Sequence, residues 1–433
     1  MTEVRIFAGM TIDLGRARLA RLMTLGLAVA LITVGAAAQA QETIRGESVL
    51  TRSRPELDPL GARVASFLVF PQVALEERYN DNIFSVDDER DSDFITVFEP
   101  ELRVESDWNN HALNFLGHGR IGRYADSDAE NFDDFTLAGN GRLDILRDTF
   151  VFGSLSYSRL HEDRGSPDDV GGAEPTLYKF IAGSARLVQR FNRLTLSADA
   201  PVQVFDYDDA PTSIGVINND DRDRVQADLN LRAGYEIVPQ YEAFARLSGN
   251  LRSYRADIDD NGLNRDSRGW EAVVGVALDL GGISSGDIFV GYANQTYDDA
   301  ALDTLGGLTV GAALTWDVTP LTSITARIDR VIEETTILDA SGFFATTARI
   351  RATHELLRNL ILDARFSATL NDYEGVARSD TLYRVGFGAQ YMMHRNFYVT
   401  FEYDFIKRDS NDARVAGADF RKNIYMIRLQ AQL

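Results

Sequence analysis

The sequence contains no cysteine among its 433 residues. Disulfide bonds and thiol chemistry are therefore excluded, and with them the small secreted proteins that disulfides hold together. Apart from one run near the amino terminus, no stretch is apolar for long enough to form a transmembrane helix. Basic residues are also few, because 44 Lys and Arg oppose 65 Asp and Glu and leave a net charge of −21. Such a surface repels phosphate backbones, so nucleic acid is excluded as a partner.

The apolar run near the amino terminus is LMTLGLAVALITVGAAA, which follows three arginines and closes on Ala38-Gln39-Ala40. A positively charged start, an apolar centre and small residues at the end are typical of a secretory signal peptide. We therefore expect residues 1–40 to be a cleaved signal peptide, residues 41–66 a periplasmic N-terminal extension, and residues 67–433 the main domain. A signal-anchor helix is the alternative, although the run is short for crossing a bilayer.

After Ser66 the chain alternates apolar and polar residues in segments of about 10 to 16 residues, the length that a tilted strand needs to cross a bilayer. In VQADLNLRAGYEIV, for example, every second residue is apolar and most of those between are polar. The connections are alternately tight and long, and the long ones are acidic and rich in glycine. This pattern predicts an all-β fold: a transmembrane antiparallel meander β-barrel of about 18 strands, with 16 as the alternative count.

The strands are expected to start near the following residues: Val69, Phe94, His111, Phe132, Thr149, Thr176, Arg193, Arg222, Gln240, Ser267, Gly286, Leu305, Leu321, Gly342, Asn359, Ser379, Asn396 and Asp419. A soluble β-sandwich or a propeller would also need many alternating strands. No four-stranded repeat is present, however, and strands of soluble sandwiches are usually shorter than these segments. Short turns on one side and long loops on the other favour the outer-membrane barrel.

The last strand must pair with the first, because an open sheet edge in hydrocarbon leaves backbone groups without hydrogen bonds. The final residues NIYMIRLQAQL alternate up to the end of the chain. The alternating set resembles the C-terminal strand by which the barrel assembly machinery recognises outer-membrane proteins, with leucine in place of the usual final phenylalanine. The predicted assembly signal consists of Tyr425, Ile427, Leu429, Ala431 and Leu433.

The stretch FPQVALEERYNDNIFSVDDERDSDFITVFEPELRVESDWNNHALN, residues 70–114, resembles the start of the putative β-barrel porin 2 family of Gram-negative outer-membrane proteins. The residues that carry the resemblance are Tyr79, Asp81-Asn82-Ile83-Phe84, Ser92-Asp93, Pro100 and Trp108. The resemblance implies a position in the Gram-negative outer membrane, in contact with its lipid and lipopolysaccharide. Members are often associated with exopolysaccharide secretion, which implies periplasmic polysaccharide-export components as further partners.

A barrel of this size encloses an aqueous channel, so the polar face of each strand is expected to line it. The pore-lining candidates are Arg232, Arg246, Arg252, Arg327, Arg349, Arg351, Arg365, Arg384, Arg428, Asp228, Glu236 and Asp363. Arginines gather on the strands from Leu321 to Leu370, where guanidinium groups could guide a polymer that bears uronic acids or phosphates. Alternatively, these arginines pair with neighbouring carboxylates across strands and only stiffen and wet the wall.

Aromatic residues near strand ends are expected to form the two interfacial girdles of the barrel. They are Trp108, Tyr124, Phe150, Tyr207, Tyr241, Trp270, Tyr297, Trp316, Phe343 and Phe397. Packing inside a β-protein is the alternative for these rings. A constriction is expected from a long loop that folds inward, and HEDRGSPDDVGGAEP, the third long loop, is the best candidate by length, with DDAPTSIGVINNDD, which is almost as long, as the alternative.

The sequence offers little for catalysis. Five histidines are present, and none comes with a recognisable nucleophile motif, although His161 lies beside Glu162 and Asp163. We expect no enzyme, no cofactor and no metal site, while the acidic runs 87–91 and 218–221 leave calcium binding open. The first hypothesis for function is a porin-like channel for passive export of exopolysaccharide or another hydrophilic polymer. A diffusion porin for uptake of small solutes, and a structural or adhesive barrel, are the alternatives.

Overall fold

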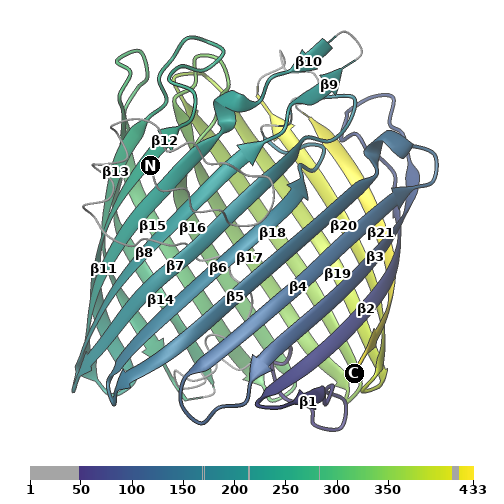
Figure 1. The fold of residues 1–433 in the computed structure, drawn as a ribbon, viewed down its shortest axis with the longest axis vertical. Coiled ribbons are helices and arrows are strands. Elements are labelled where there is room, and N and C mark those ends of the chain that lie inside the picture. The colour runs from purple at the N-terminus through teal and green to yellow at the C-terminus, as the bar shows by residue number, and fades with distance from the viewer. Residues whose placement is uncertain (1–47, 168, 170, 213–214, 282, 412–418) are drawn as a thin grey trace.

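The computed structural model describes residues 48–433 except 168, 170, 213–214, 282 and 412–418. The predicted signal peptide therefore lies outside the described residues. The described chain forms a closed antiparallel barrel of eighteen long strands, with almost no helix (Figure 1). No helix in the described ranges is both long and apolar enough to span a membrane.

The eighteen barrel strands have the following bounds: β2 Phe67–Asn80, β3 Asp93–Ser106, β4 Ala112–Tyr124, β5 Phe132–Leu146, β6 Thr149–His161, β7 Leu177–Phe191, β8 Leu194–Tyr207, β11 Arg224–Val238, β12 Tyr241–Tyr254, β13 Ser267–Asp279, β14 Ser284–Tyr297, β15 Leu305–Thr319, β16 Thr322–Glu333, β17 Gly342–Leu357, β18 Leu360–Glu374, β19 Ser379–His394, β20 Phe397–Ser410 and β21 Phe420–Gln432. Every predicted start lies within two residues of the observed one. The period-two alternation therefore locates the strands well.

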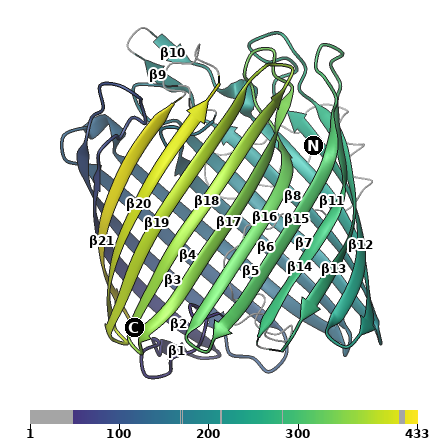
Figure 2. The ribbon, with the colours of Figure 1, turned by 180° about the vertical axis from the view of Figure 1, so that it is seen from behind.

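Each barrel strand pairs with its neighbours in the chain, and the sheet closes on itself. β21 pairs with both β20 and β2, with Gln432 opposite Gln72 and Ile424 opposite Asn80. Figure 2 shows the second half of the chain, from β13 to β21, forming the opposite side of the same wall. The last strand thus removes the open edge, as predicted from the terminal alternation.

The connections have the two lengths that the sequence predicts. Eight turns at one rim are short, and several of them follow a β-bulge, as at Glu236 and Asp317. Bulges are common at barrel rims because they sharpen the local bend. The connections at the other rim are mostly longer, and one of them carries the small hairpin β9 Ala210–Thr212 and β10 Gly215–Ile217. An exception is the connection between β18 and β19, which is reduced to residues 375–378 because β18 extends to Glu374.

Three small elements were not predicted. The short strand β1 Ala62–Val64 pairs with the start of β2 at the short-turn rim, next to the carboxyl end (Figure 1). The 3-10 turns η1 Asp128–Glu130 and η2 Asp220–Arg222 lie in the long loops. These elements have too few residues for a recognisable periodicity.

One seam of the wall is incomplete. β15 and β16 pair only from Thr319 to Gly311, where Gly311 lies opposite Asp329. Beyond that point, residues 305–310 pair with β14 alone and residues 330–333 with β17 alone. The upper end of the β16–β17 hairpin therefore lies outside the backbone ladder with β15. It still contacts β15, because the Thr309 hydroxyl donates to the Arg330 carbonyl at 2.9 Å and Phe344 packs on Leu305.

Candidate functional site: the charged inner wall

The two faces of the barrel differ in chemistry along every strand. On β17, Ile350 is 51% exposed on the outer face, while Arg349 and Arg351 on either side of it point the other way. Large apolar side chains exposed on the outer face recur around the barrel, for example Leu137, Leu155, Leu187, Leu229, Leu247, Val274, Ile288, Leu308, Leu314, Ile350, Phe366, Phe387, Phe401 and Ile427. In a soluble protein such a continuous apolar surface would aggregate, whereas in a bilayer it faces lipid.

The structure places the predicted pore-lining residues on the strand faces that alternate with these apolar residues. Arg349 lies opposite Arg327 and Ser367, Arg384 lies opposite Ser367, and Arg428 lies opposite Glu76. Asp228, Arg232 and Glu236 share one face of β11 with each other and alternate with exposed Leu229, Leu231 and Tyr235.

Arg252 differs from the other predicted pore-lining arginines because it is buried. Only 7% of its surface is exposed, because it donates a hydrogen bond to Glu334 in the connection between β16 and β17. The same carboxylate accepts hydrogen bonds from the hydroxyl groups of Tyr254 at 2.9 Å and Tyr297 at 3.4 Å. Arg252 therefore anchors the inward-leaning β16–β17 hairpin and does not face open water, because the hairpin covers it.

Aromatic side chains near strand ends divide between the two faces. Trp270 and Trp316 are 47% and 44% exposed on the outer face, as expected for interfacial girdles. Tyr297 and Phe343 are only 6% and 5% exposed, and they belong to apolar clusters inside the loop end of the barrel. The girdle prediction is wrong for these two residues and also for Tyr124, Phe150 and Tyr207, because all five share the face of the lumenal residues on their strands.

Arginines on the inner wall lie directly opposite one another at three places. The register pairs Arg232 with Arg246, Arg327 with Arg349, and Arg351 with Arg365. Like charges directly opposite on neighbouring strands are destabilising by a few tenths of a kcal/mol to about 1 kcal/mol. If these side chains served only to make the inner wall hydrophilic, opposite charges at the same places would do so and would also stabilise the sheet.

Carboxylates neutralise part of this positive charge. Arg365 donates to Glu402 at 2.6 Å and lies 3.4 Å from Asp404, while Arg351 lies 3.3 Å from Asp363. Ion pairs also join Arg246 to Glu271, Arg232 to Glu242, and Arg428 to Glu76 and Glu99. The hypothesis of pairing across strands therefore describes these arginines correctly.

A second group of arginines is less completely neutralised. Arg327 and Arg349 share one oxygen of Asp329 at 3.1 Å each, and they remain 63% and 54% exposed. Arg384 is exposed and makes no ion pair with any residue that the structure describes. These guanidinium groups are available to a solute.

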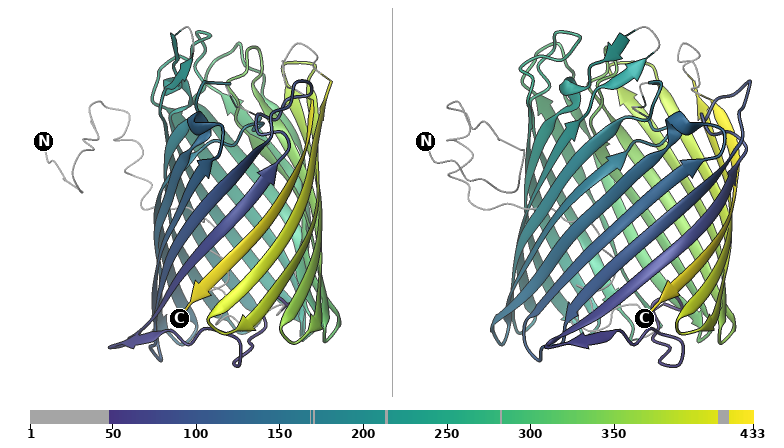
Figure 3. Two further views of the ribbon diagram at one scale, coloured as in Figure 1. Left: turned by 90° about the vertical axis from the view of Figure 1, so that its right-hand side faces the viewer. Right: turned by 45° about the vertical axis from the view of Figure 1, so that its right-hand side comes forward.

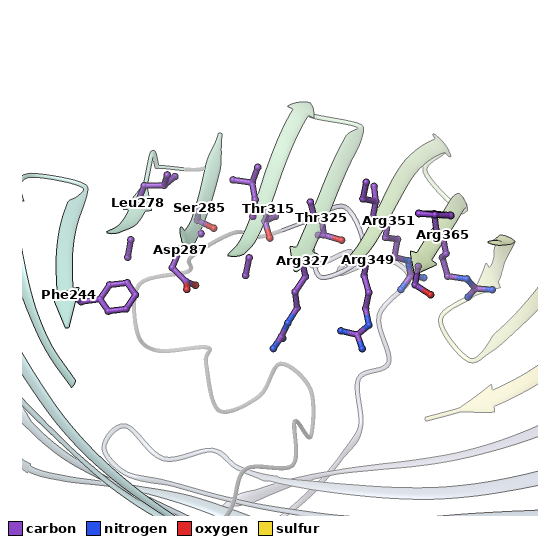
Figure 4. Close-up of a pocket in the computed structure, with 18 of the residues that line it drawn as sticks. Phe244, Leu278, Ser285, Asp287, Thr315, Thr325, Arg327, Arg349, Arg351 and Arg365 are labelled. Atoms are coloured by element: carbon purple, nitrogen blue, oxygen red, sulfur yellow. The ribbon is translucent and has the colours of Figure 1, made fainter. Parts of the chain in front are cut away.

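The arginines border a hollow along the inner wall with a volume of about 750 Å³. Its lining runs from Arg232 on β11 to Arg384 on β19, with small residues such as Ala313 and Ser367 between the charged ones. Figure 4 shows Arg327 and Arg349 side by side, extending away from their strands into this space, with Asp287 further along the wall. Charged side chains therefore project from the inner wall into this hollow.

A segment that precedes β1 enters the barrel at the short-turn rim. Val49 is fully buried against Ile361, Met392 and Tyr398 on the inner face. Its backbone amide donates to the Ser323 hydroxyl at 2.8 Å, and the Tyr398 hydroxyl donates to the Leu57 carbonyl at 2.7 Å. This end of the barrel, seen at the bottom of both views in Figure 3, is therefore partly filled by the segment 48–58.

Two ion pairs hold this segment. Arg54 lies 2.9 Å from Glu355, and both side chains are almost completely buried. Glu56 accepts a hydrogen bond from Arg358 at 2.6 Å on the surface, and this bond holds the pKa of Glu56 below its usual value. The predicted periplasmic extension thus includes a short plug, which composition alone could not reveal.

The opposite end is narrowed by loops, as the sequence predicted for the third long loop. Arg408 on β20 donates to the carbonyl oxygens of Gly165 at 3.0 Å and Ser166 at 3.5 Å, and the Ser85 hydroxyl donates to the Arg164 carbonyl at 2.9 Å. The residues of this loop that are described thus reach the inner face near the barrel seam. The predicted inward fold is confirmed for residues 164–166.

His161, the histidine with acidic neighbours in the sequence, is held by contacts with its neighbours in the structure. His161 lies 2.9 Å from the Asp134 carboxylate and stacks on the Phe132 ring, with 4.0 Å between the ring centres. No group of three or more His, Asp or Glu side chains suited to a metal ion occurs within the described ranges.

The five residues of the predicted assembly signal lie on β21 and just after it. Tyr425, Ile427 and Leu429 are exposed on the outer face, and Leu433 hydrogen-bonds through its backbone to Pro71 and Gly61. Recognition by the assembly machinery remains a prediction from the sequence.

Comparison with known protein families gives a match that covers most of the chain. The sequence profile of the family described as putative beta-barrel porin 2 matches residues 54–433. No curated protein matches the sequence.

Similar solved structures include outer-membrane proteins of Pseudomonas aeruginosa. OpdL is 15% identical, with a TM-score of 0.43 over 86% of this chain and 100% of that one. OpdK in a structure with vanillate is 12% identical (TM-score 0.44; 84% and 99% covered), and OccK2 (OpdF) is 12% identical (TM-score 0.45; 86% and 98% covered).

Proposed function

The chain belongs to the putative beta-barrel porin 2 family and lies in the outer membrane of Gram-negative cells, and from this premise we propose that it is a passive diffusion channel for small hydrophilic solutes. The channel has no chemistry of its own. Apolar side chains on the outer face and charged ones on the inner face support a water-filled passage.

The observation that carries the choice of small solutes is the narrowing at both ends. The segment 48–58 occupies part of the short-turn mouth, and the loops around Gly165 and Glu334 reach the inner wall at the other. A chain of linked sugars must keep the whole passage open during export, whereas a small solute needs only the space between these segments. Polymer export was the first hypothesis from the sequence, and this geometry supports the uptake alternative better.

The experiment is conductance of the purified chain in planar bilayers, combined with swelling of proteoliposomes in sugars of increasing size. We expect stable ion conductance and entry of monosaccharides, with a cut-off below the size of an oligosaccharide of many units. Absence of conductance would contradict the proposal. Equal passage of dextran chains and monosaccharides would favour polymer export instead.

A further inference from the structure

We propose that Arg327, Arg349 and Arg384 form a binding site on the inner wall for organic solutes that carry two carboxylates. This inference rests on the proposed channel function and names the solute class that the channel retains as it passes. The site lies in the hollow of about 750 Å³ on strands β16 to β19 (Figure 4).

The register brings these side chains into one row across four strands. Arg327 on β16 lies opposite Arg349 on β17, and Arg349 lies opposite Ser367 on β18. Ser367 in turn lies opposite Arg384 on β19. Residues in register on neighbouring strands are about 5 Å apart, so the row presents two adjacent guanidinium groups and a third roughly 10 Å from Arg349.

The row carries more positive than negative charge. Arg327 and Arg349 share the carboxylate of Asp329, while Arg384 has Asp404 nearby on β20 but forms no ion pair with it. The neighbouring row differs, because Arg351 and Arg365 have Asp363, Glu402 and Asp404 beside them. The unbalanced charge is therefore local to the row of Arg327, Arg349 and Arg384, and it matches a ligand with two negative charges.

The chemistry of the row favours carboxylates. A guanidinium group binds a carboxylate through two parallel hydrogen bonds, and it keeps its charge at every physiological pH. Ser367, between Arg349 and Arg384, is small and offers a hydroxyl group, so the middle of a ligand has room. A flexible chain of four to six carbons with a carboxylate at each end would reach from the arginine pair to Arg384.

One neighbouring group limits the site. Asp287 on β14 lies opposite Ala313, and Ala313 lies opposite Arg327, so a carboxylate stands two strands beyond the arginine pair. It repels a dianion that would extend in that direction. The ligand is therefore expected to lie from Arg327 towards Arg384.

The test measures current through the full-length purified protein in planar bilayers, with glutarate as the probe. Glutarate is expected to lower the open-channel current in a concentration-dependent manner, and butyrate, with one carboxylate, is expected to have little effect. In the double variant Arg349→Gln, Arg384→Gln, the concentration of glutarate for half-block should rise at least about tenfold, the effect of losing roughly 1.4 kcal/mol of binding.

The control is Arg186→Gln. Arg186 lies on β7, opposite Asp199, and eight strands away from β17 around the barrel. It also faces the lumen, so a change there alters the charge of the channel without touching the row. Block by glutarate should be the same in this variant as in the unaltered protein.

Titration calorimetry of glutarate on the detergent-solubilised barrel gives a second readout that does not depend on conduction. Normal conductance in potassium chloride without block or heat from glutarate would overturn the site and leave the channel proposal standing. Equal block in the double variant, or tighter block by a polyuronate chain than by glutarate, would also overturn it. A barrel that binds glutarate and never conducts would support the site and contradict the channel.

Discussion

Arg327 and Arg349 lie directly opposite each other on neighbouring strands, and both donate to the same oxygen of Asp329 at 3.1 Å. The shared carboxylate reduces the repulsion between two like charges that face water. Asp329→Asn keeps the size of the side chain and removes its charge. We expect anion preference to increase, with a stability loss of about 0.5 kcal/mol from the unscreened pair.

The measurement for Asp329→Asn is the reversal potential across a potassium chloride gradient. A shift towards the chloride equilibrium potential is expected. A shift towards the potassium potential would show that Asp329 does not face the permeating ions.

Charge reversal of Arg349, Arg351 and Arg365 to Glu tests the inward assignment more broadly. All three share the inner face of β17 and β18, so the reversal potential should move towards cation preference. Arg147→Glu, in the exposed turn after β5, changes the net charge by the same amount as each of these substitutions. It should shift the reversal potential much less. Unchanged selectivity in the triple variant would mean that the register of these strands is wrong.

The segment 48–58 is predicted to restrict the short-turn mouth. Arg54→Ala removes the closer partner of the buried Glu355 carboxylate and leaves only Arg358 at 3.7 Å, and breaking a buried pair costs about 3 kcal/mol. We expect the segment to detach and single-channel conductance to rise. Glu56→Gln removes only a surface pair with Arg358 and should leave the conductance unchanged, because exposed pairs contribute little.

The third long loop gives a matched pair of glycine variants. Gly165 has a φ of 83°, and a Cβ there would lie 2.7 Å from the Cβ of Ser85. Gly171 has a φ of 66°, and a Cβ there would meet nothing within 4 Å. Gly165→Ala should therefore push the loop from the lumen and raise conductance, whereas Gly171→Ala carries the same backbone strain and should not. Equal effects of the two changes would show that strain alone matters.

The loop before β11 should respond to pH. Burial raises the pKa of Asp223 to about 6, although the Tyr207 amide, at 2.7 Å, and Arg255 favour its charged form. Because Asp223 binds this proton more tightly in the folded loop than in the unfolded chain, folding of the loop becomes more favourable as pH falls from about 6 towards 4. Hydrogen exchange of the Tyr207 amide, corrected for intrinsic rates, should slow over this range. Asp223→Asn should abolish the trend, and slower exchange at higher pH would contradict it.

The sequence predicts the strands and their two faces because both depend on a local period of two. The same alternation assigns Tyr297 to the inner face, because it is an even number of residues from Asp287 on the same strand. The inward direction of Tyr297 could therefore have been predicted from the alternation, whereas its position near a strand end wrongly suggested an interfacial girdle. The plug at Val49 and the anchoring of Glu334 by Arg252 could not be predicted. Each joins residues far apart in the chain, between 80 and about 350 positions, and local periodicity carries no information about such contacts.

The opposed arginines form an intermediate case. Their common face follows from alternation within each strand, but the register between strands decides which ones meet. Turn lengths and bulges set that register, as at Glu355 and Leu357 before β18. A slip of two residues would have kept every face and separated Arg327 from Arg349.

The most direct test of the account uses the absence of cysteine from the natural chain. Ser367 and Phe366 are neighbours on β18 that face the lumen and the lipid, respectively. Single-cysteine variants at these two positions are to be reconstituted in planar bilayers and exposed to a membrane-impermeant, charged thiol reagent. We predict rapid modification with a lasting change of current at position 367 and none at position 366. Modification at 366 but not at 367, or at both equally, would contradict a water-filled channel enclosed by a lipid-facing wall.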